Sequence, residues 1–291
     1  MKKIFLLNGG SKTREAFKQG LSKSEFISLK TKETILHIDH DLNIHFVNDG
    51  QPIDFQDSYV FTRLRASDAH FSGILYEHLR ALGIPASDPI NLSFKLSEEK
   101  TSQMARLARA SIRIPETIVA REESFAKNRH YIEEHISFPL VYKTDGSQGK
   151  NVSLVNSMKE LEQLIADKEP HALFILQENI PNTFDTRTLV AYGKILGTIK
   201  RTAPAGKFLN NVSQGGTVST YELTAEEREI ALKATAVCGL DFGGVDLIHT
   251  EDGPIMLEVN KAPQIHGFER VYGKDIVFST IARLIEEKFG G

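Results

Sequence analysis

Short apolar runs divided by glycine-rich and polar turns characterise the first third of the chain. Residues 4–7 (IFLL) predict a buried strand that ends in the turn NGGS. Residues 35–38 and 44–47 alternate and are split by polar residues, which predicts a hairpin. A further strand is expected at 59–61 and a helix over about 69–82. This pattern indicates a small α/β unit.

The middle of the chain mixes amphipathic helical segments with apolar strands. A composition shift at SDPINLS marks a boundary before it. The expected helices cover about 97–110, 122–135 and 157–166, and the expected strands cover 112–120, 138–143, 152–155 and 172–180.

Longer strands follow in the last third. Thr224 precedes Glu227 by three residues, the spacing of a capping box at the start of a helix. The expected strands are 187–193, 194–203, 243–248 and 254–260, and the expected helices are 224–237 and about 275–288.

Composition and charge narrow the class of protein. The 291 residues suffice for two or three packed units, and a hydrophobic content of 41% supports a sizeable core. A net charge of -3 does not suggest a nucleic-acid partner. The single cysteine fits a reducing compartment, and no apolar run is long enough for a membrane span. A cytoplasmic protein with no membrane partner is expected.

Oxygen-bearing side chains gather where the last two strands meet. Glu258 and Asn260 are two residues apart, so they share one face of a strand. If the preceding turn is centred near Asp252, Asp246 lies opposite Glu258. Like charges in that position repel, and a bound cation would remove the cost. Such donors suit Mg²⁺ or Mn²⁺, although polar strand ends in solvent would give the same pattern.

A glycine-containing loop, TDGSQGKN at 144–151, separates two predicted strands. Its glycines would allow backbone amides to face an anion, but an ordinary turn uses the same residues. Lys143 ends the apolar strand before it, where a phosphate partner would balance the charge. Lys100 is a second candidate, although an exposed helix lysine is equally consistent. The polar end of LQENI, at 176–180, could hold adenine or simply meet solvent.

Seven stretches occur in a characteristic order between Ser97 and Lys288. They are FPLVYKTDGSQGKNV, LQENI, DTRTLV, FLNNVSQGG, LTAEEREIALKA, GGVDLI and LEVNKAP. Together they resemble the ATP-grasp superfamily and, within it, the RimK-like ligases that add glutamate to ribosomal protein tails. The resemblance implies a mixed α/β (α+β) ATP-grasp fold. It implies a Rossmann-like pre-ATP-grasp domain at 1–93, a central subdomain with the glycine-rich lid loop at 94–176, and a C-terminal subdomain with the metal site at 177–291.

The resemblance also implies a reaction. ATP would phosphorylate a carboxylate to an acyl phosphate, and an amine would displace phosphate to form an amide. The implied cofactors are ATP and Mg²⁺ or Mn²⁺, with two ions expected. The implied substrate is an amino acid, a peptide or a protein, and a homo-oligomer is possible.

Site residues follow from the matching positions. Lys100 and Lys143 would hold phosphates, residues 177–180 the adenine, Asp185 the ribose, and Asn211 would lie near phosphates and metal. Arg187 and Arg201 would act catalytically on the acyl phosphate and oxyanion. The implied nucleotide-binding set is Lys100, Lys143, Ser147, Gln148, Gly149, Gln177, Glu178, Asn179, Ile180, Asp185 and Asn211, and the implied metal ligands are Asp246, Glu258 and Asn260.

Departures from the family pattern leave the substrate open. Leu209 and Gln214 stand where the glutamate ligases have arginines, and Lys207 replaces an acid. Lys261 and His266 could line an acidic or peptide site or face solvent. A peptide-cyclising ligase, an ATP-grasp kinase acting on a hydroxyl, and a nucleotide-binding module without turnover are the alternatives to a RimK-like ligase.

Overall fold

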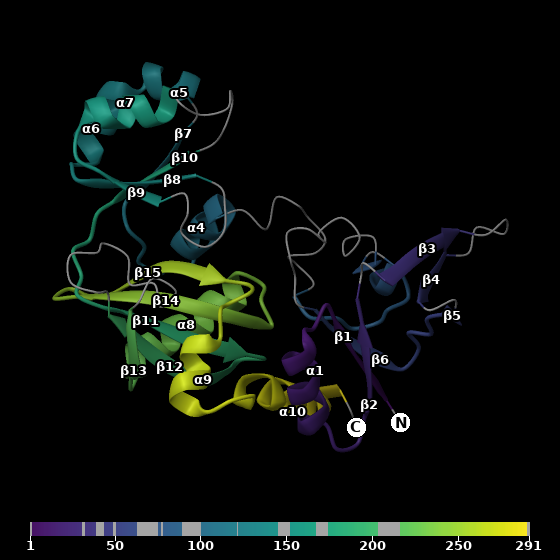
Figure 1. Ribbon diagram of the computed structural model, residues 1–291. Helices are drawn as coiled ribbons and strands as arrows, with labels where there is room; N and C mark the ends of the chain where they lie inside the picture. Colours follow the sequence, from purple (N-terminus) through teal and green to yellow (C-terminus); the bar gives the residue numbers. More distant parts are fainter. Residues whose placement is uncertain are drawn as a thin grey trace.

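The computed structural model describes residues 2–30, 33–38, 44–48, 51–62, 75–76, 78–88, 100–120, 122–144, 152–166, 174–202 and 216–289. The described chain is a mixed α/β protein with four sheets (Figure 1). No helix in this part of the chain is long and apolar enough to cross a membrane.

The N-terminal unit contains a parallel sheet and a small antiparallel one. The parallel sheet has the order β2-β1-β6, and the predicted hairpin pairs β3 with β4. The strands are β1 (Lys3–Leu7), β2 (Glu25–Leu29), β3 (Thr34–Ile38), β4 (Ile44–Asn48), β5 (Gln51–Pro52) and β6 (Ser58–Thr62). The helix expected at 69–82 is described only in part, and its described residues 75–76 and 78–81 are helical.

Helix α1 and the strands β2 and β5 of this unit were not anticipated from the sequence. Helix α1 (Ser11–Gly20) has a mostly polar sequence, but it buries Thr13, Ala16, Phe17 and Gly20. These positions follow the i, i+3, i+4, i+7 spacing of one helix face, a signal that a strict periodicity count would have found.

The central unit is an antiparallel sheet in the order β7-β10-β8-β9, with α5, α6 and α7 on one side and α4 on the other (Figure 1). The elements are α4 (Lys100–Arg109), β7 (Thr117–Ala120), α5 (Glu122–Lys127), α6 (Arg129–His135), β8 (Leu140–Thr144), β9 (Val152–Val155), α7 (Met158–Ala166) and β10 (Phe174–Glu178). The single helix predicted over 122–135 is wrong, because the chain breaks at Asn128. The Asn128 side chain donates to the Ser124 carbonyl at 2.7 Å, a local bond of the kind that competes with helix continuation.

The C-terminal unit is a five-stranded antiparallel sheet in the order β13-β12-β11-β14-β15. Its strands are β11 (Asp185–Ala191), β12 (Lys194–Thr202), β13 (Thr217–Thr220), β14 (Phe242–Thr250) and β15 (Gly253–Asn260), and its helices are α8 (Ala225–Val237), α9 (His266–Tyr272) and α10 (Ile276–Phe289). The predicted capping box at Thr224 and Glu227 is confirmed, whereas β13 and α9 were not predicted.

The two faces of this sheet differ in chemistry. One face packs Val190, Val245 and Leu247 with Ala231 and Ala234 of α8. The other face carries Leu189, Ala191 and Phe242 at one end, where they join a core formed with α10. The remaining end of that second face is charged and forms the candidate site.

The predicted domain boundaries stay predictions. The strands fall into the three expected groups, but β10 continues to Glu178, past the boundary proposed at residue 176. The last helix packs on the first unit: α1 lies along α10 (Figure 1). A Cβ on Gly20 would lie 2.2 Å from the Ser279 carbonyl oxygen, so only glycine allows this close approach.

A carboxylate fixes the same contact from the other side. Glu286 of α10 accepts hydrogen bonds from the amides of Ser22, Lys23 and Ser24 at 2.5–2.8 Å. Burial would raise the pKa of Glu286, but the hydrogen bonds from Lys23, Ser22 and Ser24 outweigh it and lower this pKa from 4.5 to about 2. The loop after α1 therefore binds the charged form of Glu286.

Replacing Glu286 tests this contact. Because the folded-state pKa is depressed, the stabilisation is complete above about pH 4.5 and is lost as the pH falls toward about 2. Glu286→Gln should lower the free energy of unfolding by about 1 kcal/mol at pH 7, a modest value because solvent screens the carboxylate. Urea unfolding between pH 7 and pH 3 should show this difference shrinking.

Glu287→Gln is the matched control, because Glu287 lies on the same helix and forms an exposed ion pair with Lys194. A stability difference for Glu286→Gln that stayed constant over the same pH range would contradict the assignment.

Candidate active site

A β-bulge decides which residues of the last hairpin meet. Thr250 pairs with Gly253, so the turn is centred between Glu251 and Asp252, and an unbroken ladder would place Leu257 opposite Asp246. The register shifts after Leu247, and Asp246 pairs with Glu258 instead. The predicted pairing is therefore confirmed, but the extra residue in β15 produces it rather than the turn alone.

The bulge also sets the face on which Glu258 lies. Without it, Glu258 would pair with Val245, which is fully buried against α8. With it, Glu258 joins Asp246 on the charged face, and Val259 points into the α8 core. The Asn260 Nδ2 donates to Glu258 Oε1 at 3.0 Å and lies 3.4 Å from Asp246 Oδ2. The three predicted metal ligands thus gather at one place.

Two arginines surround Asp246. The Arg187 guanidinium donates to both Asp246 oxygens, at 2.7 and 2.6 Å, and Arg201 donates to Asp246 Oδ2 at 2.9 Å. Arg201 also binds Asp185 at 2.5 Å. Arg187 is the direct cross-strand neighbour of Asp246, as Arg201 is of Asp185. The register of β11 with β12 and β14 therefore builds this network.

Burial makes the network electrostatically strong. Asp246, Asp185 and Arg201 are all less than a tenth exposed. Burial would raise the pKa of Asp246, but Arg187 and Arg201 outweigh it and hold this pKa below its usual value. Asp246 is therefore a carboxylate over the physiological range. From the sequence, a metal ion was expected to relieve the repulsion between Asp246 and Glu258. In the structure, Arg187 and Arg201 already balance the charge of Asp246.

The donor set also fits a hard cation. A carboxylate offers about four acceptor positions, and among the described residues Asp246 Oδ1 receives only the Arg187 bond, so it keeps room for another partner. The amide nitrogen of Asn260 points at both carboxylates, and holding a cation would require its Oδ1 to face them instead. Among the described residues no three His, Cys, Asp or Glu side chains cluster as ligands, so this set depends on the amide.

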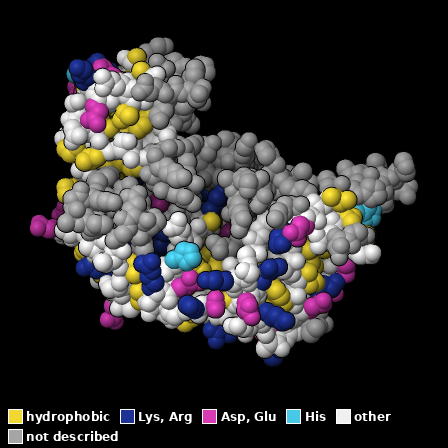
Figure 2. Space-filling model, in the orientation of Figure 1, with side chains coloured by type: hydrophobic (Ala, Val, Ile, Leu, Met, Phe, Trp, Pro, Cys, Tyr) yellow, Lys and Arg dark blue, Asp and Glu magenta, His cyan; other side chains and the backbone are white. Residues whose placement is uncertain are grey.

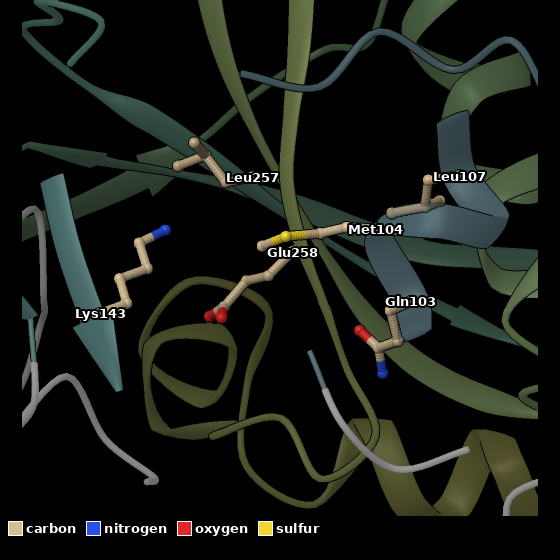
Figure 3. A pocket seen from close by; sticks show the side chains of 6 residues that line it. All are labelled: Gln103, Met104, Leu107, Lys143, Leu257 and Glu258. Atoms are coloured by element: carbon tan, nitrogen blue, oxygen red, sulfur yellow. The ribbon is translucent and has the colours of Figure 1, made fainter. Parts of the chain in front are cut away.

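A pocket lies beside Glu258, between the central sheet and the C-terminal sheet. Figure 3 shows Lys143 of β8 and Glu258 of β15 on its walls, with Gln103 and Met104 of α4 completing it. The other lining residues are Leu107 and Leu257. One wall thus carries a cation and another a carboxylate. The lining residues on α4, and Leu257, were not predicted, because only three-dimensional packing brings α4 next to β15.

Lys143 lies near the end of β8, where an unpaired charge would be costly. Its ammonium donates to Gln177 Oε1 of the neighbouring β10. Gln177 is 1% exposed and also donates from Nε2 to Thr117 Oγ1 at 2.9 Å. Thr117 was not anticipated as part of the site, and the β7–β10 pairing that places it there is not visible in the local sequence.

The structure describes only some of the other residues predicted to bind nucleotide. Glu178 ends β10 and is exposed, and its amide donates to the Glu116 carbonyl at 2.9 Å. Asn179 and Ile180 follow it and are half-buried. Lys100 begins α4, but its side chain lies outside the described residues. Ser147, Gln148, Gly149 and Asn211 also lie outside them, as do Lys207, Leu209 and Gln214.

One face of the molecule carries both signs of charge. Figure 2 shows the described Lys and Arg side chains intermixed with Asp and Glu on this face rather than gathered in one basic patch.

The chain is similar to proteins named as ligases. It is 32% identical over 271 residues to a probable alpha-L-glutamate ligase of Shewanella halifaxensis (strain HAW-EB4). The aligned region covers 91% of this chain and 58% of that protein. It is 33% identical over 235 residues to one of Cellvibrio japonicus (strain Ueda107), covering 78% of this chain and 76% of the relative. The chain therefore spans little more than half the length of the first relative.

Solved structures share the fold. The ATP-grasp ligase PsnB, complexed with a phosphomimetic variant of its minimal precursor, Mg and ADP, matches with a TM-score of 0.72 at 17% identity over 98% of both chains. The macrocyclase MdnC of Microcystis aeruginosa MRC, bound with its precursor peptide MdnA, matches with a TM-score of 0.70 at 16% identity over 98% of this chain and 99% of that one.

The family model described as the RimK-like ATP-grasp domain matches residues 97–285. The resemblance drawn from the sequence and the predicted fold class are therefore both confirmed, and the chain belongs to the RimK-like ATP-grasp family.

Proposed function

We propose that the protein is an ATP-dependent carboxylate–amine ligase that forms an amide bond on an amino acid or a peptide. The observation that carries this proposal is the bulge-enforced pairing of Asp246 with Glu258, with Asn260 beside them and Lys143 across the pocket. Oxygen donors on one wall and a cation on the other suit a metal-bound triphosphate.

The names of related proteins support the reaction class. The curated relatives are named as glutamate ligases, and a structural neighbour was solved with Mg and ADP. Mg²⁺ is the proposed ion, Mn²⁺ shares its ligand preference, and two ions are part of the proposal. Asp246, Glu258 and Asn260 would hold the metal. Bound metal would neutralise phosphate charge and orient the nucleotide.

The chemistry divides into two displacements. A substrate carboxylate oxygen attacks the terminal phosphorus of ATP, and the bond to ADP breaks. The amine nitrogen then attacks the acyl carbon, the bond to phosphate breaks, and the amine loses a proton. Lys143 would hold the phosphates during the first displacement, and Arg187, at the solvent side of its network, would meet developing negative charge.

The remaining predicted roles belong to the same proposal. Residues 177–180 would receive adenine, and Lys100, Ser147, Gln148, Gly149 and Asn211 would surround the phosphates. Asp185 is proposed near the ribose, although its carboxylate binds Arg201 in this structure. A homo-oligomer and a cytoplasmic location stay predictions that light scattering and cell fractionation would test.

Amine-dependent turnover tests the reaction class. Incubating the protein with ATP, Mg²⁺ and a pool of amino acids and peptides should release ADP only when an acid and an amine are both present. Mass spectrometry should then find a product lighter by one water than the sum of its substrates. Loss of water from a single peptide would instead identify a cyclising ligase. ADP release with an alcohol alone would identify a kinase, and binding without ADP release a regulatory module.

Replacing Glu258 tests the metal assignment. Glu258→Gln keeps the size of the side chain and removes the charge, so turnover should fall by about a thousandfold or more while the melting temperature changes little. Glu251→Gln, in the turn of the same hairpin, is the control. Turnover that persisted in Glu258→Gln with Mg²⁺ would contradict the proposed ligand role.

Substitutions of Arg187 and Arg201 should have different effects on turnover and stability. Arg201→Met would leave two buried carboxylates sharing Arg187, so the free energy of unfolding should fall by about 3 kcal/mol. Arg187 is the more exposed of the two, and Arg187→Lys keeps its positive charge. This variant should therefore lose turnover, while its free energy of unfolding should fall less than that of Arg201→Met. Urea unfolding and ADP release, with Arg283→Met as a surface control, measure both. Equal losses of stability would argue against a catalytic role for Arg187.

A further inference from the structure

A partly buried hydrogen-bond chain ends at the Lys143 ammonium. It begins at the Pro115 carbonyl, which accepts from Thr117 Oγ1 at 2.7 Å. Thr117 Oγ1 accepts in turn from Gln177 Nε2 at 2.9 Å, and Gln177 Oε1 accepts from Lys143. Thr117 and Gln177 are direct partners across β7 and β10, so the sheet register holds the chain together.

The chain has a fixed direction. The hydroxyl hydrogen of Thr117 is used by a backbone carbonyl that cannot reverse its role, so Thr117 Oγ1 can only accept from Gln177. The amide nitrogen of Gln177 must therefore face Thr117, and its oxygen must face Lys143. Met104 Sδ, 3.8 Å from the same nitrogen, is a weak acceptor and favours the same orientation.

The neutral amide matters for the charge of Lys143. A carboxylate at position 177 would form an ion pair and cancel the charge that faces the pocket. An apolar side chain would remove one acceptor from this half-buried ammonium, which is costly. An amide oxygen orients the ammonium without neutralising its charge. Gln177 is 1% exposed, so its side chain acts inside the protein rather than in the pocket.

We propose that Gln177, oriented by Thr117, is a positioning residue that directs the Lys143 ammonium toward nucleotide phosphates. This inference rests on the proposed nucleotide site, and it assigns the Gln177 side chain a role other than adenine contact. Thr117 sets the direction of the amide, Gln177 transmits it, and Lys143 meets the ligand.

A matched pair of variants tests the chain at its far end. Thr117→Val removes the hydroxyl at nearly constant volume, whereas Thr117→Ser keeps it. Thr117→Val should weaken ATP binding by about threefold to tenfold, the value of one hydrogen bond, and Thr117→Ser should restore it. Thr188→Val is the control, since Thr188 is buried and bonds Thr198 on the α8 side of the other sheet. Calorimetry with ATP and with adenosine measures both ligands.

The comparison of ligands separates positioning from adenine contact. Gln177→Glu and Thr117→Val should weaken ATP binding and leave adenosine binding unchanged. Equal losses for ATP and adenosine would overturn the proposal, and so would identical binding by Thr117→Val and Thr117→Ser. The melting temperature of each variant shows whether a loss reflects unfolding.

A measurement without nucleotide keeps the proposal independent of the enzyme reaction. Carbon-13 labelling of lysine Cε, with Lys143 assigned through Lys143→Arg, reports the titration of its ammonium by NMR. Gln177→Glu should raise the pKa of Lys143 by about one unit, since an opposite charge favours the charged form. An unchanged titration would overturn the proposed contact. A wild-type protein that shows these effects but makes no amide would refute the proposed function alone.

Discussion

The burial of the Asp246 carboxylate is the constraint on which the site depends. A buried carboxylate is tolerated only with charged partners, and Arg187 and Arg201 supply them from neighbouring strands. These contacts require β11, β12 and β14 to pair in one register, because each ion pair joins direct or near cross-strand neighbours. The network therefore fixes the strand register and presents the oxygens of Asp246 next to Glu258.

Two sheets contribute side chains of opposite charge to the site. The C-terminal sheet contributes the carboxylates of Asp246 and Glu258, and the central sheet contributes Lys143. Helix α4 contacts β15 and lines the pocket with Gln103 and Met104. The space between the sheets is therefore charged on two sides, and Met104 and Leu107 of α4 add apolar surface on the third, an arrangement suited to a ligand with a charged end and a flat apolar end.

Local patterns predicted the parts of the site that lie on one hairpin. The alternation in β15 placed Glu258 and Asn260 on one face, and an assumed turn centre near Asp252 placed Asp246 opposite Glu258. The capping box at Thr224 follows from spacing alone. The bulge at Leu257 was invisible to this reasoning, because the estimated turn centre and the bulge shift the register by the same amount.

Contacts between distant segments could not be predicted in this way. Arg187 and Asp246 are 59 residues apart, and nothing in either segment specifies their pairing. The family resemblance marked Arg187 and Arg201 as functional but did not reveal that they hold a buried carboxylate. The direction of the Gln177 side chain likewise depends on the β7–β10 register and on the hydroxyl of Thr117. The structure does not describe Ser147, Gln148, Gly149 and Asn211, so the roles inferred for them from the sequence stay predictions.

The packing of α10 on α1 has a consequence for the order of folding during synthesis. Phe17 contacts Phe26 and Phe61 of the N-terminal sheet, but it also contacts Phe278, and Gly20 lies against Ser279. On the ribosome the N-terminal sheet can pair its strands early and cover one part of α1, whereas the part that faces α10 stays uncovered until residues 276–289 emerge. Chaperones that bind nascent apolar segments would therefore meet this part of α1 until α10 is made.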